Sequence, residues 1–87
     1  SLKAMDARRK KLLFRSQHCG MKENDFLLGR FAAVHAATLG DDDLSAFEAL
    51  LLEADNDIYN WVTVKEAPPV RHDTPLLAAL IAFNNPT

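Results

Sequence analysis

Three side chains that could do chemistry lie together near the first turn of the chain: the hydroxyl of Ser16, the imidazole of His18 and the thiol of Cys19. A nucleophilic site needs a base aimed at the nucleophile and a third group that orients this base. Because His18 and Cys19 are adjacent near a helix end, we expect their side chains to diverge. An ordinary exposed or half-buried thiol is therefore the simpler interpretation.

The other polar residues give no stronger sign of catalysis or metal binding. His35 and His72 are isolated, without a ligand partner at metal spacing. The acidic groups Asp41–Asp43 and Asp55/Asp57 precede helical segments, so we interpret them as helix caps. The three glycines do not have the GxGxxG spacing of a phosphate-binding loop. The sequence predicts no catalytic residue, no metal ligand and no cofactor bound by this chain, and hence a protein that is not an enzyme.

The elements that position these residues are predicted to be helices, because apolar residues recur at helical spacing and no strand-like alternation is sustained. In the second helix this stripe runs through Leu27, Phe31 and Val34. The longest loop, 65–73, contains Pro68 and Pro69 and precedes the last helix. The predicted fold is all-α, a small antiparallel bundle of about five helices. They cover about 3–18, 22–37, 42–53, from 55 onward and from 74 onward.

Single residues within this bundle carry specific expectations. Gly20, just past the first helix, can adopt the left-handed backbone that ends many helices. Gly29, inside the second helix, predicts close packing or a bend. Phe14 and Phe31 are assigned to the core, and the spacing of Trp61 favours the core over an interface.

Length and composition predict one helical domain, 1–87, with residues 1–4 interpreted as a tag remnant or a disordered end. Hydrophobic residues make up 48% of the chain and charged residues 25%, which is typical of globular proteins. The lone Cys19 excludes an internal disulfide. The longest apolar run, 76–83, is far shorter than the ~20 residues of a membrane span. We expect a soluble protein without membrane insertion, and without a signal peptide.

The charges are unevenly distributed. Residues 1–30 hold eight Lys or Arg against three Asp or Glu, whereas residues 31–87 hold two against nine. Such a dipolar molecule can steer its basic end toward an acidic partner, although a solvated helix face is the alternative interpretation of Arg8–Lys11. A basic helix followed by a turn could also contact nucleic acid. The acidic remainder argues against that partner.

The segment from Arg15 to Asp25, Arg-Ser-Gln-His-Cys-Gly-Met-Lys-Glu-Asn-Asp, points to a more specific function. It resembles the signature of the flavinator family, the FAD assembly factors of succinate dehydrogenase. The family motif is Arg-Gly-x-x-Glu between the first two helices, usually followed by Asp, and Gly20, Glu23 and Asp25 match it. Two further stretches, 47–51 and 55–61, resemble family segments in the right order, so the resemblance covers about residues 6–83.

The resemblance implies a five-helix chaperone-like factor, a monomer when free, that binds the flavoprotein subunit of succinate dehydrogenase, with fumarate reductase as a further client. It promotes covalent attachment of FAD, which belongs to that partner. The partner-binding residues implied are Arg15, His18, Cys19, Gly20, Glu23, Asp25 and Tyr59. A plain helix C-cap for Gly20 and a plain first-turn carboxylate for Glu23 remain alternatives.

One position departs from the family motif, because Cys19 stands where the motif has Arg. A thiol supplies neither the permanent charge nor the planar donor fork of a guanidinium. Arg15, one turn earlier, is our candidate to replace part of that function; loss of part of the activity is the alternative.

The basic lead-in 8–16 is similar to the alphaproteobacterial branch of the family, which implies a bacterial cytoplasmic location. Two alternative functions remain open. The first is an antitoxin-like or general protein-interaction module, and the second, which we favour less, is a nucleic-acid-binding helical domain.

Overall fold

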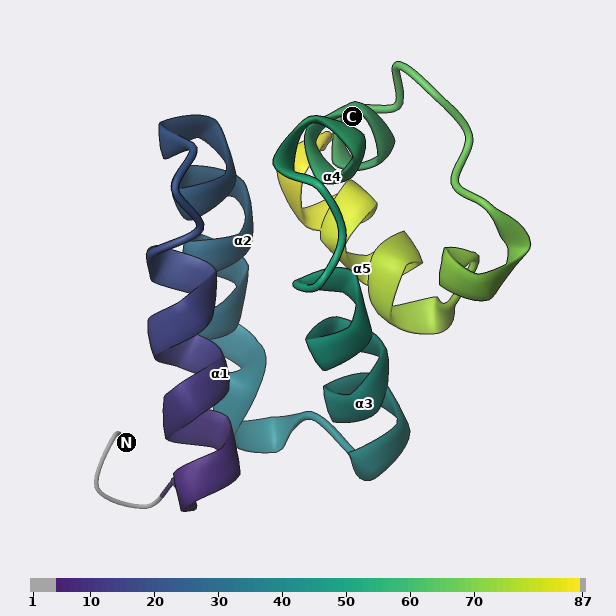
Figure 1. Ribbon diagram of the computed structural model, residues 1–87. Helices are drawn as coiled ribbons and strands as arrows, with labels where there is room; N and C mark the ends of the chain where they lie inside the picture. Colours follow the sequence, from purple (N-terminus) through teal and green to yellow (C-terminus); the bar gives the residue numbers. More distant parts are fainter. Residues whose placement is uncertain (1–4, 87) are drawn as a thin grey trace.

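The chain folds into helices, as the apolar spacing predicts, joined by short turns and by one longer loop between α4 and α5 (Figure 1). The computed structural model describes residues 5–86. Five α-helices and two short 3₁₀ helices are found in this part of the chain, and no strand. In chain order they are α1 (Ala7–Gln17), α2 (Lys22–His35), η2 (Ala36–Thr38), α3 (Asp41–Leu50), α4 (Asp55–Val62), η3 (Val70–His72) and α5 (Pro75–Asn84). Residues 1–4, which we interpreted as a tag remnant or a disordered end, lie outside the described residues.

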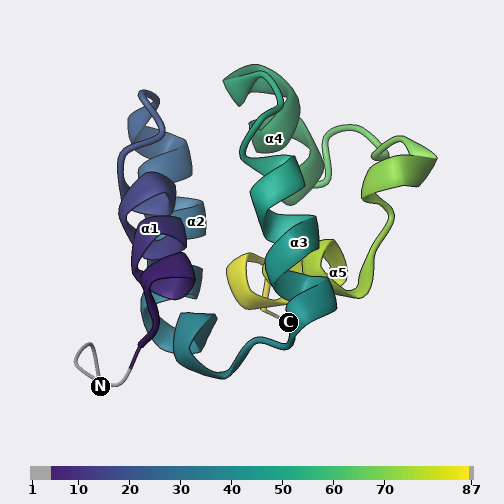
Figure 2. The same cartoon turned by 60° about the horizontal axis from the view of Figure 1, so that its bottom comes forward.

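The helices form two groups (Figures 1 and 2). α1 and α2 run antiparallel side by side, and beside this hairpin α5 packs against both α3 and α4. The segment after α2 crosses at one end of the molecule to α3, and the α1–α2 turn lies at the opposite end, together with α4. The core contains apolar side chains from every α-helix. They are Leu12, Leu28, Phe31, Ala32, Leu44, Phe47, Leu50, Ile58, Trp61, Val62, Leu76, Leu77 and Leu80, with Ala36 from η2.

Close packing of α1 against α2 depends on Gly29. A Cβ atom built there would lie 3.0 Å from Cγ and 3.3 Å from Cα of Gln17. Real Cβ contacts are almost always longer, so a side chain at position 29 would push the two helices apart. The expectation of close packing at Gly29 is confirmed.

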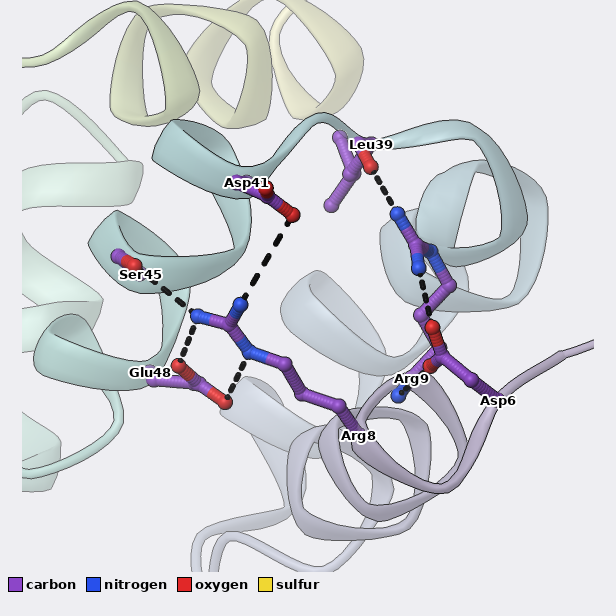
Figure 3. Close-up of polar contacts among 7 residues, drawn as sticks. All are labelled: Asp6, Arg8, Arg9, Leu39, Asp41, Ser45 and Glu48. Carbon is purple, nitrogen blue, oxygen red and sulfur yellow. Dashed lines mark hydrogen bonds and ion pairs between the residues drawn. The ribbon is translucent and has the colours of Figure 1, made fainter.

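Arg8 joins the two groups of helices (Figure 3). Its Nε and Nη2 atoms donate to the two carboxylate oxygens of Glu48 at 3.0 and 2.7 Å, and Nη2 also donates to Ser45 Oγ at 2.9 Å. Asp41 lies 4.0 Å from Nη1. The neighbouring Arg9 donates to the Leu39 carbonyl. The start of α1 is therefore fixed to α3, and this part of the basic run is not simply solvated.

The ends of two helices differ from the prediction. Gly40 and Ala54 occupy the N-cap positions of α3 and α4, and neither cap makes a side-chain hydrogen bond. The carboxylates Asp41–Asp43, Asp55 and Asp57 lie in the first turns instead. There they interact favourably with the helix dipole without accepting the capping hydrogen bond. The interpretation of these groups as N-cap residues is wrong by one position.

The cap of the last helix is as predicted. Thr74 accepts a hydrogen bond from the Leu77 N–H at 3.1 Å, and Pro75 begins α5. The loop before α5 contains the short helix η3, whereas the sequence predicted no helix between residues 65 and 73. His72 is buried within it, with its ring against Trp61 and its Nε2 atom donating to Glu53. Arg71 pairs with the same carboxylate at 3.0 Å, so Glu53 fixes this loop to the bundle.

Two apolar side chains assigned to the interior lie outside it. Phe14 is 61% exposed and Val34 is 63% exposed, whereas Phe31 and Trp61 are buried as predicted. The reason is the helical period: with Leu12 and Ser16 buried, position 14 lies on the opposite face of α1. Within residues 5–86, no helix is long and apolar enough to cross a membrane.

Candidate functional site

The α1–α2 turn is closed by a side chain from α2. Gly20 has a φ of +92°, outside the range that other residues adopt readily. Asp25, in the first turn of α2, accepts a hydrogen bond from the backbone N–H of Cys19. The predicted left-handed backbone at Gly20 is confirmed. One carboxylate oxygen of Asp25 is thus engaged within its own chain, and its predicted contact with a partner stays a prediction.

A buried amide fixes this turn against α4. Asn24 is fully buried, and its Nδ2 atom donates to the backbone carbonyl of Asp55 at 2.9 Å. The carboxylate of Asp55 lies 3.6 Å from the point where a Cβ atom on Gly20 would stand. The turn, the start of α2 and the start of α4 therefore form one connected unit.

A first hollow of about 200 Å³ lies between the end of α1 and the start of α4. Its lining includes Arg15 and Cys19, which are both half-buried. His18 is exposed, and its ring stacks on Phe14 with centroids 4.1 Å apart. Its Nδ1 atom lies 2.7 Å from the Phe14 carbonyl oxygen. The remaining lining residues are Leu51, Asp55 and Ile58.

The thiol of Cys19 is held in its protonated form. Burial raises the pKa of this thiol to about 11, and the negative charges of Asp25 and Asp55 act in the same direction. The nearby positive charge of Arg15 acts against them, with a smaller effect. The Sγ atom donates to backbone carbonyls, 3.3 Å to Ser16 and 3.5 Å to Arg15. A thiolate nucleophile is therefore disfavoured at this position.

A second hollow lies on the other side of the turn, between α2 and α4. It has a volume of about 460 Å³ and a mostly apolar surface. Glu23 and Tyr59, two of the predicted site residues, line it. The other lining residues are Lys22, Phe26, Leu27 and Thr63.

The predicted site residues thus divide between two hollows. Arg15, His18 and Cys19 line the first, and Glu23 and Tyr59 line the second. The remaining two, Gly20 and Asp25, shape the turn that lies between the hollows.

Sequence reasoning missed several lining residues. Phe14 and Phe26 are the exposed aromatic residues among them, and Asp55 is the one that lies beside Gly20. A signal existed for two of them. Phe14 and His18 are four residues apart on one helix, and so are Lys22 and Phe26. Residues at this spacing lie on one face of a helix. Nothing in the sequence placed Asp55 beside Gly20.

The arrangement is suited to receive protein side chains. Two neighbouring hollows flank a glycine turn, and aromatic and charged residues surround them. Among residues 5–86, no group of three or more His, Cys, Asp or Glu side chains is placed to hold a metal ion.

Fold and turn together define a small helical bundle with a glycine turn exposed between two hollows. A family model described as the flavinator of succinate dehydrogenase matches residues 10–84. The chain belongs to this family.

Relatives at substantial identity carry consistent names. The mitochondrial succinate dehydrogenase assembly factor 2 of Dictyostelium discoideum is 42% identical over 69 residues, 79% of this chain and 49% of the relative. That of Candida glabrata is 42% identical over 60 residues, 69% of this chain and 39% of the relative. The mitochondrial assembly factor 2-A of Drosophila sechellia is 33% identical over 78 residues, which are 87% of this chain and 48% of the relative. The chain spans about half the length of the curated relatives it matches, or less.

These names contradict the expected bacterial cytoplasmic location, because all three relatives are named mitochondrial proteins. The expectation rested on the basic segment 8–16, which lies within α1. In the structure Arg8 and Arg9 from that segment hold α1 against α3 and the preceding loop. These contacts give the two basic residues a function in folding, which carries no information about the compartment.

Proposed function

We propose that this protein is an assembly factor that binds the flavoprotein subunit of succinate dehydrogenase and promotes covalent attachment of FAD to it. The observation that carries the proposal is the turn itself. Gly20 and Glu23 of the family motif lie beside two hollows that can receive side chains of the client. Family membership and the names of the relatives supply the client.

The chain acts by binding and not by catalysis. Its thiol is protonated at physiological pH, and His18 is stacked on Phe14 rather than directed at a nucleophile. A binder can raise the rate of flavin attachment by favouring the client conformation in which the reacting groups are aligned. FAD stays with the client, and none of the three glycines belongs to a phosphate-binding loop.

Arg15 takes over part of the function of the motif arginine. It lines the same hollow as Cys19, and its charge acts on the thiol. A guanidinium at position 15 can therefore reach a carboxylate of the client from the same hollow.

The test is reconstitution with the purified flavoprotein subunit and FAD. Covalent flavin is measured by in-gel fluorescence. Size-exclusion chromatography with light scattering gives the mass of the complex and of the free chain, which we expect to be a monomer. We expect a 1:1 complex and a gain in covalent flavin. Arg15→Ala should reduce both, with Lys10→Ala, an exposed cation on the same helix, as the matched control. An Arg15→Ala variant with normal binding and flavin gain would contradict the role of Arg15.

Cys19→Arg separates two versions of the proposal. If it only strengthens an existing gain in covalent flavin, the thiol is tolerated. If the natural chain binds the client without any gain and Cys19→Arg restores it, the natural chain has kept the interface and lost the activity. Absence of any complex would disprove the proposed function.

A further inference from the structure

The second hollow presents apolar surface that the fold does not use. Phe26 is 59% exposed, although its position on α2 is next to the half-buried Leu27. Across the hollow, Tyr59 comes from α4 and Thr63 is the C-cap of that helix, so the surface is a groove between two helices. Apolar area of this kind costs about 25 cal/mol per Å² while it faces water. A concave apolar surface between helices is typical of a binding site for a side chain.

Positive charges surround this groove. The Lys65 ammonium lies 4.8 Å from the centre of the Tyr59 ring, and the Arg30 guanidinium lies 4.6 Å from that of Phe26. Lys22 is itself a lining residue. Glu23 is the single acidic residue in the lining.

Among the residues that the structure describes, these three cations have no acidic partner, as is also true of Lys10, Lys11 and Arg15, but only they lie beside the groove. Within residues 5–86 no ion pair includes Lys22, Arg30 or Lys65, whereas Arg8 and Arg71 are both paired. The one acidic side chain next to Lys65, Glu66, accepts a hydrogen bond from Asn60 Nδ2 at 2.7 Å. The groove therefore combines an apolar floor with an unneutralised positive rim.

We propose that this groove, defined by Lys22, Glu23, Phe26, Leu27, Tyr59 and Thr63, binds a segment of the client flavoprotein in which a large apolar side chain is flanked by carboxylates. This inference rests on the proposed function and adds a second contact beyond the turn. The apolar side chain fills the hollow of about 460 Å³, and the carboxylates pair with Arg30, Lys65 and Lys22. Glu23 belongs to the motif and also lines the groove. One client segment can therefore run continuously from the turn into the groove.

The first experiment measures the affinity of variants for the purified FAD-loaded flavoprotein subunit by calorimetry. Phe26→Ala should weaken binding about tenfold or more, because an anchor in a hollow contributes more than a peripheral contact. Val70→Ala is its control, since Val70 is 92% exposed on η3, away from the groove. The charge reversal Arg30→Glu/Lys65→Glu should weaken binding more at 50 mM than at 300 mM salt, because salt screens exposed charges. Lys10→Glu should have little effect. Circular dichroism confirms that each variant is folded.

The second experiment identifies the occupant. A photo-cross-linking benzoylphenylalanine replaces Thr63, and the cross-linked client peptide is identified by mass spectrometry. We expect a peptide with a large apolar residue and at least one Asp or Glu within a few positions. A basic or wholly polar peptide would overturn the proposed chemistry.

The outcomes separate this inference from the proposed function. If the natural chain binds the client and the Arg15→Ala variant loses binding while Phe26→Ala and the charge reversal do not, the groove proposal fails and the assembly function stands. If the natural chain does not bind the client, both fail. Vesicles of anionic phospholipid are the last comparison: vesicle binding that Phe26→Ala abolishes, with client binding unaffected, would assign the groove to lipid and overturn the proposal.

Discussion

The carboxylate of Asp25 accepts a hydrogen bond from the backbone N–H of Cys19, and so a residue in the first turn of α2 holds the chain that leaves α1. This contact spans the glycine of the family motif. It gives Asp25 a structural function inside the chain, and it positions the backbone that we propose a client contacts.

Asp25→Ala should destabilise the protein by about 1–2 kcal/mol, because it leaves a half-buried N–H without its charged acceptor. Asp57→Ala is the matched control, since Asp57 is also in a first turn and is exposed. Urea unfolding measures both. Equal small effects for the two variants would show that Asp25 contributes only through the helix dipole.

Gly20→Ala should cost about 1–2 kcal/mol of stability, because alanine is strained at a φ of +92°. The strain comes from the backbone and not from crowding: the nearest atom to the new Cβ would be at an ordinary 3.6 Å. Gly40→Ala should be neutral or slightly stabilising, since Gly40 has a φ of −74° and nothing lies within 4 Å of its Cβ position. Thermal unfolding of the two variants compares them directly. A Gly20→Ala protein as stable as Gly40→Ala would refute this account of the turn.

Acid should destabilise the fold through Glu48 and Glu53. Hydrogen bonds from Arg8 lower the pKa of Glu48, and those from Arg71 and His72 lower the pKa of Glu53, in each case below the ordinary 4.5. A lowered folded-state pKa means that the stabilisation is present above about pH 4.5 and is lost as the pH falls through the folded-state value.

The measurement is the urea midpoint between about pH 7 and pH 3. Glu48→Gln and Glu53→Gln should each be less stable at pH 7 and show a shallower decline. Added salt should reduce the contribution of the Arg8–Glu48 pair in particular, because both side chains are more than a third exposed. Decline curves parallel to that of the natural protein would contradict this origin of the acid sensitivity.

Cys19 should react slowly with iodoacetamide in the folded protein. At pH 8, about three units below its pKa of about 11, roughly one thiol in a thousand is ionised. Denaturation in urea should raise the rate by two orders of magnitude or so, because burial and the Asp25 and Asp55 charges are removed together. Alkylation followed by mass spectrometry gives both rates. Rapid alkylation of the folded chain would show that the thiol is ionised and accessible.

The helical class and most helix positions could be predicted from the sequence, since both follow from local spacing. The prediction was less successful where a helix face had to be assigned. Phe14 is apolar, yet it lies on the outer face of α1 because Leu12 and Ser16 occupy the inner one. Hydrophobicity alone could not show this; the period of 3.6 residues, applied strictly, could have.

The motif residues of the candidate site were also available from the sequence, because Gly20, Glu23 and Asp25 are a local pattern. Their division between two hollows was not available. It depends on α4, about 30 residues later in the chain, which supplies Asp55 to the first hollow and Tyr59 to the second.

The sequence by itself determined what depends on neighbours along the chain: five amphipathic helices, the glycine turn and the family signature. The tertiary structure decided what depends on contacts between distant segments. These include the Arg8–Glu48 pair, the Asn24 bond to the start of α4, and the groove with its unpaired cations. The physical reason is that helix spacing is a local property, whereas burial, charge pairing and hollows arise only when helices far apart in sequence pack against each other.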